Sequence, residues 1–142
     1  MGKWYEISKH VNLREVGQKC LTTTFSPNSN GTVNVDIAGV YKLVNYQRSS
    51  NGLGIPDDNI PSKWTLNGIN GRQMLWILDT DYDNYSLIYS CYSLPVLNIN
   101  FEDPRIMSRT PQLDQQYIDK LKERLTGFDR FLMSDTSHRN CD

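Results

Sequence analysis

The sequence predicts an all-β fold of short antiparallel strands, forming a barrel or a sandwich, with one helix late in the chain. Stretches rich in β-branched and aromatic residues recur at regular spacing from Trp4 to Ser108, and clusters of Gly, Pro, Asn, Asp and Ser separate them. Helical periodicity follows only afterwards, between Leu113 and Leu125. A parallel α/β fold would require a helix between every pair of strands, so the pattern excludes it.

The first strands follow one another closely. Trp4–Ser8 begins the first strand, and His10–Gln18 is polar and irregular enough to form a long loop. Cys20–Ser26 is β-branched and bounded by turn residues. Asn28–Gly31 then supplies a hairpin turn, and Thr32–Leu43 continues as a strand.

The stretch Asn45–Pro61 is the least determined part of the chain. Its residues 49–52 (Ser-Ser-Asn-Gly) and 56–58 (Pro-Asp-Asp) are turn formers, which leave room for one short strand at most. Beyond it we predict four further strands, at Lys63–Ile69, Met74–Asp79, Ser86–Ser93 and Arg105–Ser108.

The one predicted helix has a single apolar stripe. Leu113, Tyr117, Leu121 and Leu125 recur every four residues, with Ile118 beside them. Asp114 is a suitable N-cap, and Gly127 is a suitable end. We expect this helix to pack against the outside of the sheet.

Composition limits the partners. A chain of 142 residues with 38% hydrophobic content can bury the core of one domain without a metal. Its 15 basic and 16 acidic residues give a net charge of -1 and are scattered singly, which predicts no electrostatic footprint for nucleic acid or an anionic membrane. The longest apolar run, Met74–Leu78, falls far short of the ~20 residues that a membrane span requires. We expect a soluble protein with no membrane span.

One acidic cluster suggests calcium and is better explained as a turn. Asp79, Asp81 and Asp83 alternate like the first ligands of a calcium loop. The Gly and Glu that such a loop requires are replaced by Asn84 and Ser90. We therefore predict a turn whose carboxylates cap its own backbone.

Residues for catalysis are sparse. The two histidines, His10 and His138, offer little to a Ser-His-Asp or Cys-His centre, and His138 and Cys141 have ligand-like spacing without further convergent ligands. We predict no catalytic residue, no metal and no cofactor. Asn30 and Asn84 begin N-glycosylation patterns at turns, and Asn30 is the predicted acceptor.

Three short segments spread along the chain carry a family resemblance: Gly2–Glu6 (Gly-Lys-Trp-Tyr-Glu), Thr80–Tyr85 and Ser108–Pro111. In this order, before one late helix, they resemble the signature regions of the lipocalin family, in particular the apolipoprotein D, insect bilin-binding protein and Lazarillo group. Residues 18–20 and 89–91 also have counterparts there. The resemblance covers nearly the whole chain. It implies a single lipocalin domain over residues 1–142: an eight-stranded antiparallel up-and-down β-barrel with the C-terminal α-helix packed outside.

The resemblance implies a floor at the closed end of the barrel. A barrel that closes its first strand on its last brings Trp4 and Arg109 together, and in lipocalins the matching pair stacks. A guanidinium on an indole face contributes about 0.5–2 kcal/mol. We expect Gly2, Trp4 and Arg109 to be structural residues that do not contact ligand.

The resemblance also assigns the cysteines. Cys20 and Cys141 resemble the disulfide pair that ties an early strand to the tail in that group, which implies a secreted, extracellular protein. The partner of Cys91 would precede the first strand. Met1 stands directly before that strand with no secretory signal, so we expect that an N-terminal segment is missing. The residues alone leave open a cytosolic protein with three reduced thiols.

Alternation along strands predicts which side chains face inward. If Arg109 points into the floor, Met107, Arg105, Asp103 and Phe101 share its face. If Cys91 points outward, its neighbours on the strand point in. Together with the resemblance, alternation predicts an apolar ligand-binding lining of Ile37, Trp64, Leu66, Leu75, Ile77, Ile88, Ser90, Tyr92, Arg105 and Met107.

Arg105 departs from the resembled group, which has an aromatic residue at this point of the last strand. An unpaired buried guanidinium is costly, so Arg105 either pairs with Asp103, reaches the open rim or meets an anionic ligand. This raises the expectation of a carboxylate-bearing ligand, such as a fatty acid or a bilin, over a neutral steroid or plain hydrocarbon.

We therefore expect an extracellular protein, monomeric or weakly dimeric, that binds a small hydrophobic ligand for transport or sequestration: a bilin, fatty acid, retinoid or sterol. The alternative is a lipocalin-type isomerase or hydrolase, which needs a nucleophile or base inside the barrel. Neither Cys91 nor His10 is placed to serve. A third hypothesis, an interaction module, predicts exposed apolar loop tips, for which the candidates are Val11, Leu13, Ile55 and Ile60.

Overall fold

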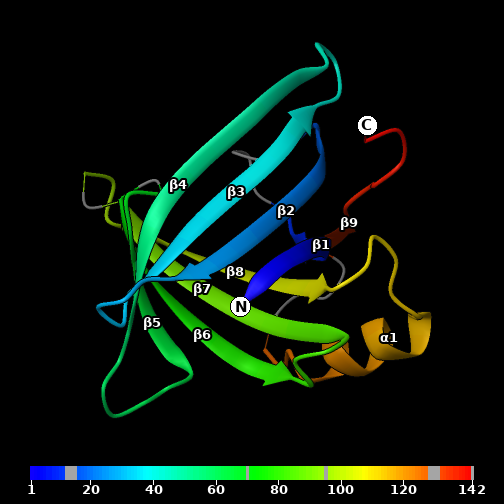
Figure 1. Cartoon of the computed structure of the whole chain (residues 1–142). Coiled ribbons are helices and arrows are strands. Elements are labelled where there is room, and N and C mark those ends of the chain that lie inside the picture. The colour runs from blue at the N-terminus through cyan, green and yellow to red at the C-terminus, as the bar shows by residue number, and fades with distance from the viewer. Residues whose placement is uncertain (12–15, 70, 95, 128–131, 142) are drawn as a thin grey trace.

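The computed structural model is a closed β-barrel with one helix outside it (Figure 1). It describes residues 1–11, 16–69, 71–94, 96–127 and 132–141. The strands are β1 (Gly2–His10), β2 (Gln18–Pro27), β3 (Val33–Tyr41), β4 (Tyr46–Pro56), β5 (Lys63–Asn67), β6 (Arg72–Thr80), β7 (Tyr85–Leu94), β8 (Ile99–Ser108) and β9 (Met133–Asp135), and the helix is α1 (Gln115–Glu123).

The strand order confirms the predicted up-and-down barrel. From β2 to β8 each strand pairs antiparallel with the next one along the chain. The first strand then pairs with β8 on one side and with β2 on the other, which closes the sheet. Closure removes the exposed edges that an open sheet would have.

The prediction for the stretch Asn45–Pro61 was wrong, because β4 is a full strand of 11 residues. It pairs with β3 without a break, from Tyr41 opposite Tyr46 to Val33 opposite Gly54. Gly52, which we interpreted as a turn former, lies inside the strand. A Cβ at this position would come within 2.6 Å of the Asn67 backbone oxygen, so the glycine permits close approach of β5.

The last barrel strand is longer than predicted, since β8 begins at Ile99 and not at Arg105. Residues 99–104 pair with β7, whereas the pairing with β1 covers Arg105 to Ser108 only. Residues 99–104 of β8 therefore pair with β7 along one edge and have no β1 partner along the other edge. Pro104 is tolerated there because proline suits a strand that is unpaired along one side.

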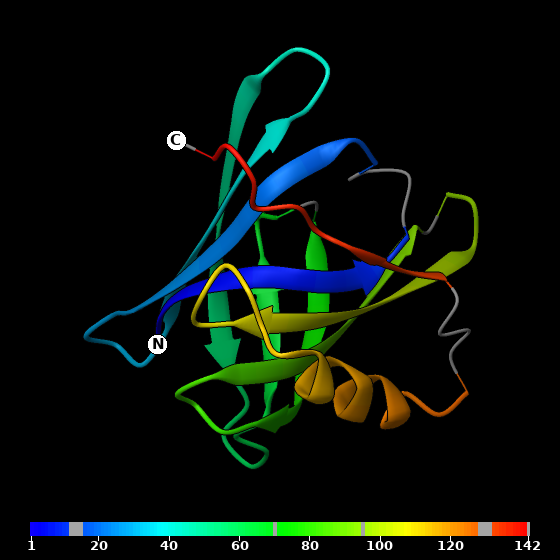
Figure 2. The same ribbon diagram turned by 90° about the vertical axis from the view of Figure 1, so that its right-hand side faces the viewer.

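The C-terminal tail forms part of the barrel wall, which the sequence did not indicate. Only residues 2–5 of β1 pair with β2, while residues 8–10 pair with β9. Backbone hydrogen bonds join Thr136 to Ile7 (2.9 Å) and Cys20 to Ser137 (2.8 Å). The tail thus runs between β1 and β2, as Figure 2 shows.

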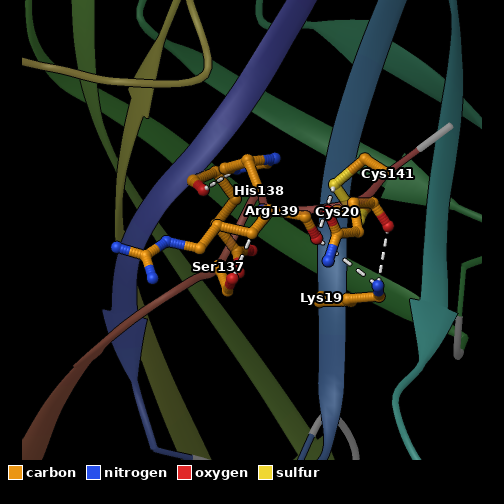
Figure 3. The surroundings of a disulfide bond; sticks show 8 residues. Lys19, Cys20, Ser137, His138, Arg139 and Cys141 are labelled. Carbon is orange, nitrogen blue, oxygen red and sulfur yellow. Dashed lines mark hydrogen bonds between the residues drawn. A yellow bond between two sulfur atoms is a disulfide. The ribbon is translucent and has the colours of Figure 1, made fainter.

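The predicted disulfide between Cys20 and Cys141 is present, with its Cα atoms 5.6 Å apart (Figure 3). The Lys19 ammonium donates to the backbone oxygen of Asn140 (2.7 Å). The ring of His138 hydrogen-bonds to the Glu6 backbone oxygen (2.7 Å). The tail is therefore fastened to both strands between which it lies.

Removing the disulfide with Cys141→Ser should lower the free energy of unfolding by about 2–5 kcal/mol, because the bond closes a loop over most of the chain. Urea unfolding without reductant measures the change. Cys91→Ser is the matched control, since Cys91 is a free, half-buried thiol, and it should change stability by about 0.5 kcal/mol or less. Equal losses for both variants would mean that the tail needs no covalent anchor.

The helix forms as predicted and packs outside the barrel. The Asp114 side chain accepts from the Gln116 backbone N–H (3.0 Å) and caps it. The helix ends at Glu123, before the predicted Gly127. Its buried face joins one apolar cluster with β1, β7 and β8: Ile7, Tyr85, Leu87, Ile106, Ile118, Leu121 and Leu125. None of the described helices is long and apolar enough to cross a membrane.

The acidic segment after β6 is a turn, as predicted. Asp81 accepts from the backbone N–H groups of Asn84 (2.8 Å) and Tyr85 (2.9 Å). Desolvation alone would raise the pKa of Asp81, but hydrogen bonds from Asn84 and Tyr85 outweigh it and lower this pKa to about 2. Asp79 instead pairs with Arg124 (2.8 Å). In the described parts of the chain, no three His, Cys, Asp or Glu side chains converge as metal ligands would.

Candidate ligand-binding site

One end of the barrel is closed by the predicted floor. The Arg109 guanidinium lies 3.7 Å from the centroid of the Trp4 ring, and Trp4 is buried. Arg109 also donates to the backbone oxygens of Tyr82 (3.0 Å) and Lys3 (3.1 Å). Gly2 has φ of +85°, which glycine adopts readily, and a Cβ there would meet the guanidinium at 3.4 Å. The floor therefore joins β1, β8 and the turn before β7.

Among the described residues, two of the cavities adjoin each other inside the barrel. The floor cavity has a volume of about 220 Å³ and is lined by Met1, Trp4, Phe25, Pro61, Trp64, Leu75, Ile77, Thr80, Tyr82, Ser86, Ile88 and Met107. The upper cavity has a volume of about 60 Å³ and is lined by Thr23, Phe25, Val35, Ile37, Leu66, Ile69, Gln73, Leu75, Ile88, Ser90, Tyr92, Asp103 and Arg105. Phe25, Leu75 and Ile88 belong to both linings, so these three side chains separate the two spaces.

All ten residues predicted to face inward line one of these cavities. Alternation from Arg109 and Cys91 oriented the residues of β7 and β8, whereas the family resemblance supplied Ile37, Trp64, Leu66, Leu75 and Ile77. Of the two further residues placed on the Arg109 face, Asp103 lines the upper cavity and Phe101 lines neither cavity. The bulge in β6 between Ile77 and Asp79 lies after the inward residues and does not disturb them. The floor residue Trp4 also lines the floor cavity, which differs from the expectation that it is remote from ligand.

Several lining residues were missed. Val35 lies two positions before Ile37 on β3, so alternation from Ile37 would have found it. Phe25 meets Trp64 edge-on, with ring centroids 5.9 Å apart. The sequence had fixed no inward-facing residue on β2 from which alternation could have placed Phe25. Gln73 donates to the Ile69 backbone oxygen (2.6 Å), and this bond holds its amide against the upper cavity.

A cluster of ionic side chains lies at the wall formed by β1 and β8. Arg105 donates to Glu6 (2.7 Å) and to Asp103 through both Nε (3.0 Å) and Nη2. Lys9 lies 3.2 Å from the other Glu6 oxygen, which also accepts from Thr136 (2.7 Å). The Glu6 side chain is 2% exposed and that of Arg105 is 15% exposed. Pairing of Arg105 with Asp103 was one of the three hypotheses from the sequence, and it is confirmed. The second partner of Arg105, Glu6, was not predicted.

This pairing removes the ground for expecting an anionic ligand. Two carboxylates already compensate the Arg105 guanidinium, so the desolvation argument no longer calls for a third. The uncharged polar side chains that line the upper cavity are those of Thr23, Gln73, Ser90 and Tyr92. Tyr92 stacks on Phe101 with ring centroids 5.0 Å apart.

His10 and Cys91, the two residues considered for catalysis, lie outside the floor cavity and the upper cavity. His10 ends β1, and Cys91 alternates with the cavity residues Ser90 and Tyr92 on β7. Neither lines the floor cavity or the upper cavity, and no described histidine or cysteine lines either of these two. The interior accordingly offers binding surface and no described cysteine or histidine nucleophile.

A closed barrel with a stacked floor and an apolar interior defines a class of small-molecule-binding β-barrels. The model of the Lipocalin / cytosolic fatty-acid binding protein family matches residues 1–129. The chain therefore belongs to this family, and the resemblance seen in its three short segments is confirmed. Small hydrophobic molecules are the ligands of lipocalins.

The similar proteins include apolipoprotein D and Lazarillo. Apolipoprotein D of Mus musculus is 31% identical, over 99% of this chain and 76% of its own length. The Lazarillo protein of Schistocerca americana is 27% identical, over 88% of this chain and 60% of its own. Among solved structures, H1 crustacyanin from the lobster Homarus americanus has a TM-score of 0.81 at 21% identity, covering 99% of this chain and 77% of that one, which shows a shared fold.

Proposed function

We propose that this protein carries or sequesters a small hydrophobic molecule in its barrel, outside the cell. The observation that carries the proposal is the pair of largely apolar cavities above a stacked floor. Burial of apolar ligand surface at ~25 cal/mol per Å² would supply the affinity, and the few polar groups would orient the ligand. The disulfide supports an extracellular site of action, because such bonds persist in oxidising compartments.

The ligand class that best suits the interior is neutral. Because Glu6 pairs with Arg105 and Lys9, and Asp103 pairs with Arg105, a free carboxylate brought into the upper cavity would be desolvated beside a cluster whose charges already balance. Of the four classes considered from the sequence, retinoids and sterols with a hydroxyl group fit this better than fatty acids or bilins. The hydroxyls of Ser90 and Tyr92 are the natural partners for such a group.

The division of the interior into two small cavities limits the size of a ligand that can enter without side-chain movement. Either cavity is smaller than the roughly 300–1,000 Å³ of common ligand sites. A ligand of that size would displace Phe25, Leu75 or Ile88, which stand between the two spaces. Side-chain rotation at these positions costs far less than opening the barrel.

Retinol and retinoic acid form a matched pair of probes, because they share a skeleton and differ in the carboxylate. Quenching of the fluorescence of Trp4 and Trp64, which line the floor cavity, reports binding. We expect retinol to bind at least about tenfold more tightly, a difference of ~1.4 kcal/mol. Tighter binding of the acid would contradict the neutral ligand class, and failure of a wide panel of hydrophobic ligands would contradict the carrier function.

A second variant pair locates the ligand. Tyr92→Ala removes an aromatic wall of the upper cavity and should weaken binding by about tenfold or more. Tyr89→Ala is the control, because Tyr89 is on the same strand, faces outward and bonds to Glu102 (2.7 Å). Urea unfolding of both variants separates a folding defect from a binding defect. Equal affinities for the two variants would place the ligand outside the upper cavity.

A further inference from the structure

The two ends of the barrel differ in composition. Loops 28–32, 57–62 and 81–84 lie at the closed end, since Arg109 of the floor bonds to Tyr82 in one of them. Successive antiparallel strands put the remaining connections at the opposite end. We call that end the open rim and define it by its described residues 11, 16–19, 41–48, 68–69, 71–72 and 96–99.

The open rim carries the most exposed aliphatic side chains of the described chain. Leu43 is 98% exposed and Val96 is 96% exposed. Val44 and Leu97 beside them are also exposed, as is Tyr46. Leu43 and Val44 form the tip of the β3–β4 hairpin, which projects beyond the other strands (Figure 1). Exposed aliphatic groups gathered at one end of a protein mark an interaction site.

These tips differ from those predicted. Val11 is at the open rim and exposed, but Ile55 and Ile60 are near the closed end. Leu13 lies outside the described residues. The three described candidates are thus exposed as predicted, but only Val11 lies at the open rim.

Charge is segregated in the same direction. The open rim, as defined, contains Lys19, Lys42, Arg48 and Arg72 and no acidic residue. The three closed-end loops contain Asp57, Asp58, Asp81 and Asp83 and no lysine or arginine. No described acidic side chain forms a recorded ion pair with a basic group of the open rim. Lys63 and Arg109 lie beside these closed-end loops, so the clearer separation is at the open rim, where basic side chains that the sequence scatters singly gather on folding.

We propose that the open rim docks on an anionic lipid surface. Leu43 and Val44 enter the headgroup region from one side of the opening, and Val96 and Leu97 from another. Lys42, Arg48 and Arg72 then face lipid phosphates. Apolar burial and attraction to anionic lipid reinforce each other in such docking.

A lipid surface suits the open rim better than a protein partner does. The described aliphatic tips lie on separate hairpins around the opening, whereas the core of a protein interface is a continuous apolar face. A lipid surface accepts separate tips, since it adapts to each of them. Docking in this orientation turns the opening of the barrel toward the lipid.

The test is co-sedimentation of the full chain with lipid vesicles. We expect binding to vesicles of phosphatidylcholine mixed with phosphatidylserine, at least about tenfold stronger than to phosphatidylcholine alone, because several basic residues each contribute about fivefold. High salt should release the protein, since the screening length falls to about 3 Å at 1 M. Equal binding to both vesicles, or binding to neither, would overturn the proposal. A rim that serves a protein partner gives the second of these results.

Variants assign the contact. The double variant Leu43→Ser with Val44→Ser should lose at least about tenfold in binding to the mixed vesicles. Its control is Ile60→Ser at the closed end, which should bind like the unmodified chain. Lys42→Glu should lose at least about fivefold, whereas Lys120→Glu on the exposed face of α1 should not. Equal losses for the rim variants and their controls would refute docking through the open rim.

Docking does not depend on the proposed cargo. Tyr92→Ala, which should weaken ligand binding, should still sediment with mixed vesicles. The Leu43→Ser and Val44→Ser variant should still quench with retinol. A failure of either proposal is therefore visible without the other.

Discussion

Arg105→Ala should lower the free energy of unfolding by about 3–5 kcal/mol, because it leaves the carboxylates of Glu6 and Asp103 buried without their shared cation. Both are nearly inaccessible to water, so hydration cannot replace the lost hydrogen bonds. Urea unfolding at neutral pH measures the effect. The loss should be found without ligand.

Arg124→Ala is the matched control for this result. Arg124 also bonds to an aspartate, Asp79, at 2.8 Å, but its side chain is 54% exposed. An exposed ion pair contributes about 0–1 kcal/mol, so the two arginine variants should differ several-fold in cost. Similar small losses would show that water reaches the Arg105 cluster and that the guanidinium is available to a ligand after all.

Trp4→Ala should cost about 3–5 kcal/mol, because it removes a large buried aromatic and exposes one face of Arg109 to an empty space. Arg109→Ala removes the same contact from the other side. A double-mutant cycle on the two residues should give a coupling of roughly 0.5–3 kcal/mol in unfolding free energy. The measurement is urea unfolding of the four proteins of the cycle.

The surface pair Lys63 and Trp76 provides the comparison for the floor. The Lys63 ammonium lies 5.8 Å from the Trp76 ring centroid, on the outer face of the barrel. Its coupling should be about 0.5–1 kcal/mol or less, as for exposed cation–π contacts. Additive effects at Trp4 and Arg109 would mean that the floor is not a unit, and that β1 and β8 are held together elsewhere.

Several features were accessible from sequence because the signal is local or periodic. Alternation from Arg109 and Cys91 oriented Met107, Ser90 and Tyr92 correctly, since the strand period of two leaves one choice per strand. The four-residue apolar spacing located α1, and Asp114 capped it as expected. The disulfide came from the family resemblance, since spacing alone could not pair three cysteines.

Other features depend on contacts between residues far apart in the chain. The sequence around Gly52 indicates a turn, and only the packing of β5 against it shows why a strand needs glycine at this position. Glu6 and Arg105 are separated by 99 residues, so which carboxylate meets the guanidinium is decided only when β1 closes on β8. The tail became a wall strand because β1 and β2 pair over only part of their length.

The sequence by itself determined the strand alternation of β7 and β8, the helix, the turn after β6 and the floor pair, because each depends on the order of neighbouring residues or on a recognisable family segment. Only the tertiary structure decided the partners of Arg105, the place of the tail and the gathering of basic side chains at the open rim. Charges that alternate in sign along the chain can gather at opposite ends of the fold, because each connection between antiparallel strands returns the chain to the other end. The sequence gives the number and spacing of the charged side chains, whereas closure of the sheet determines which of them come into contact.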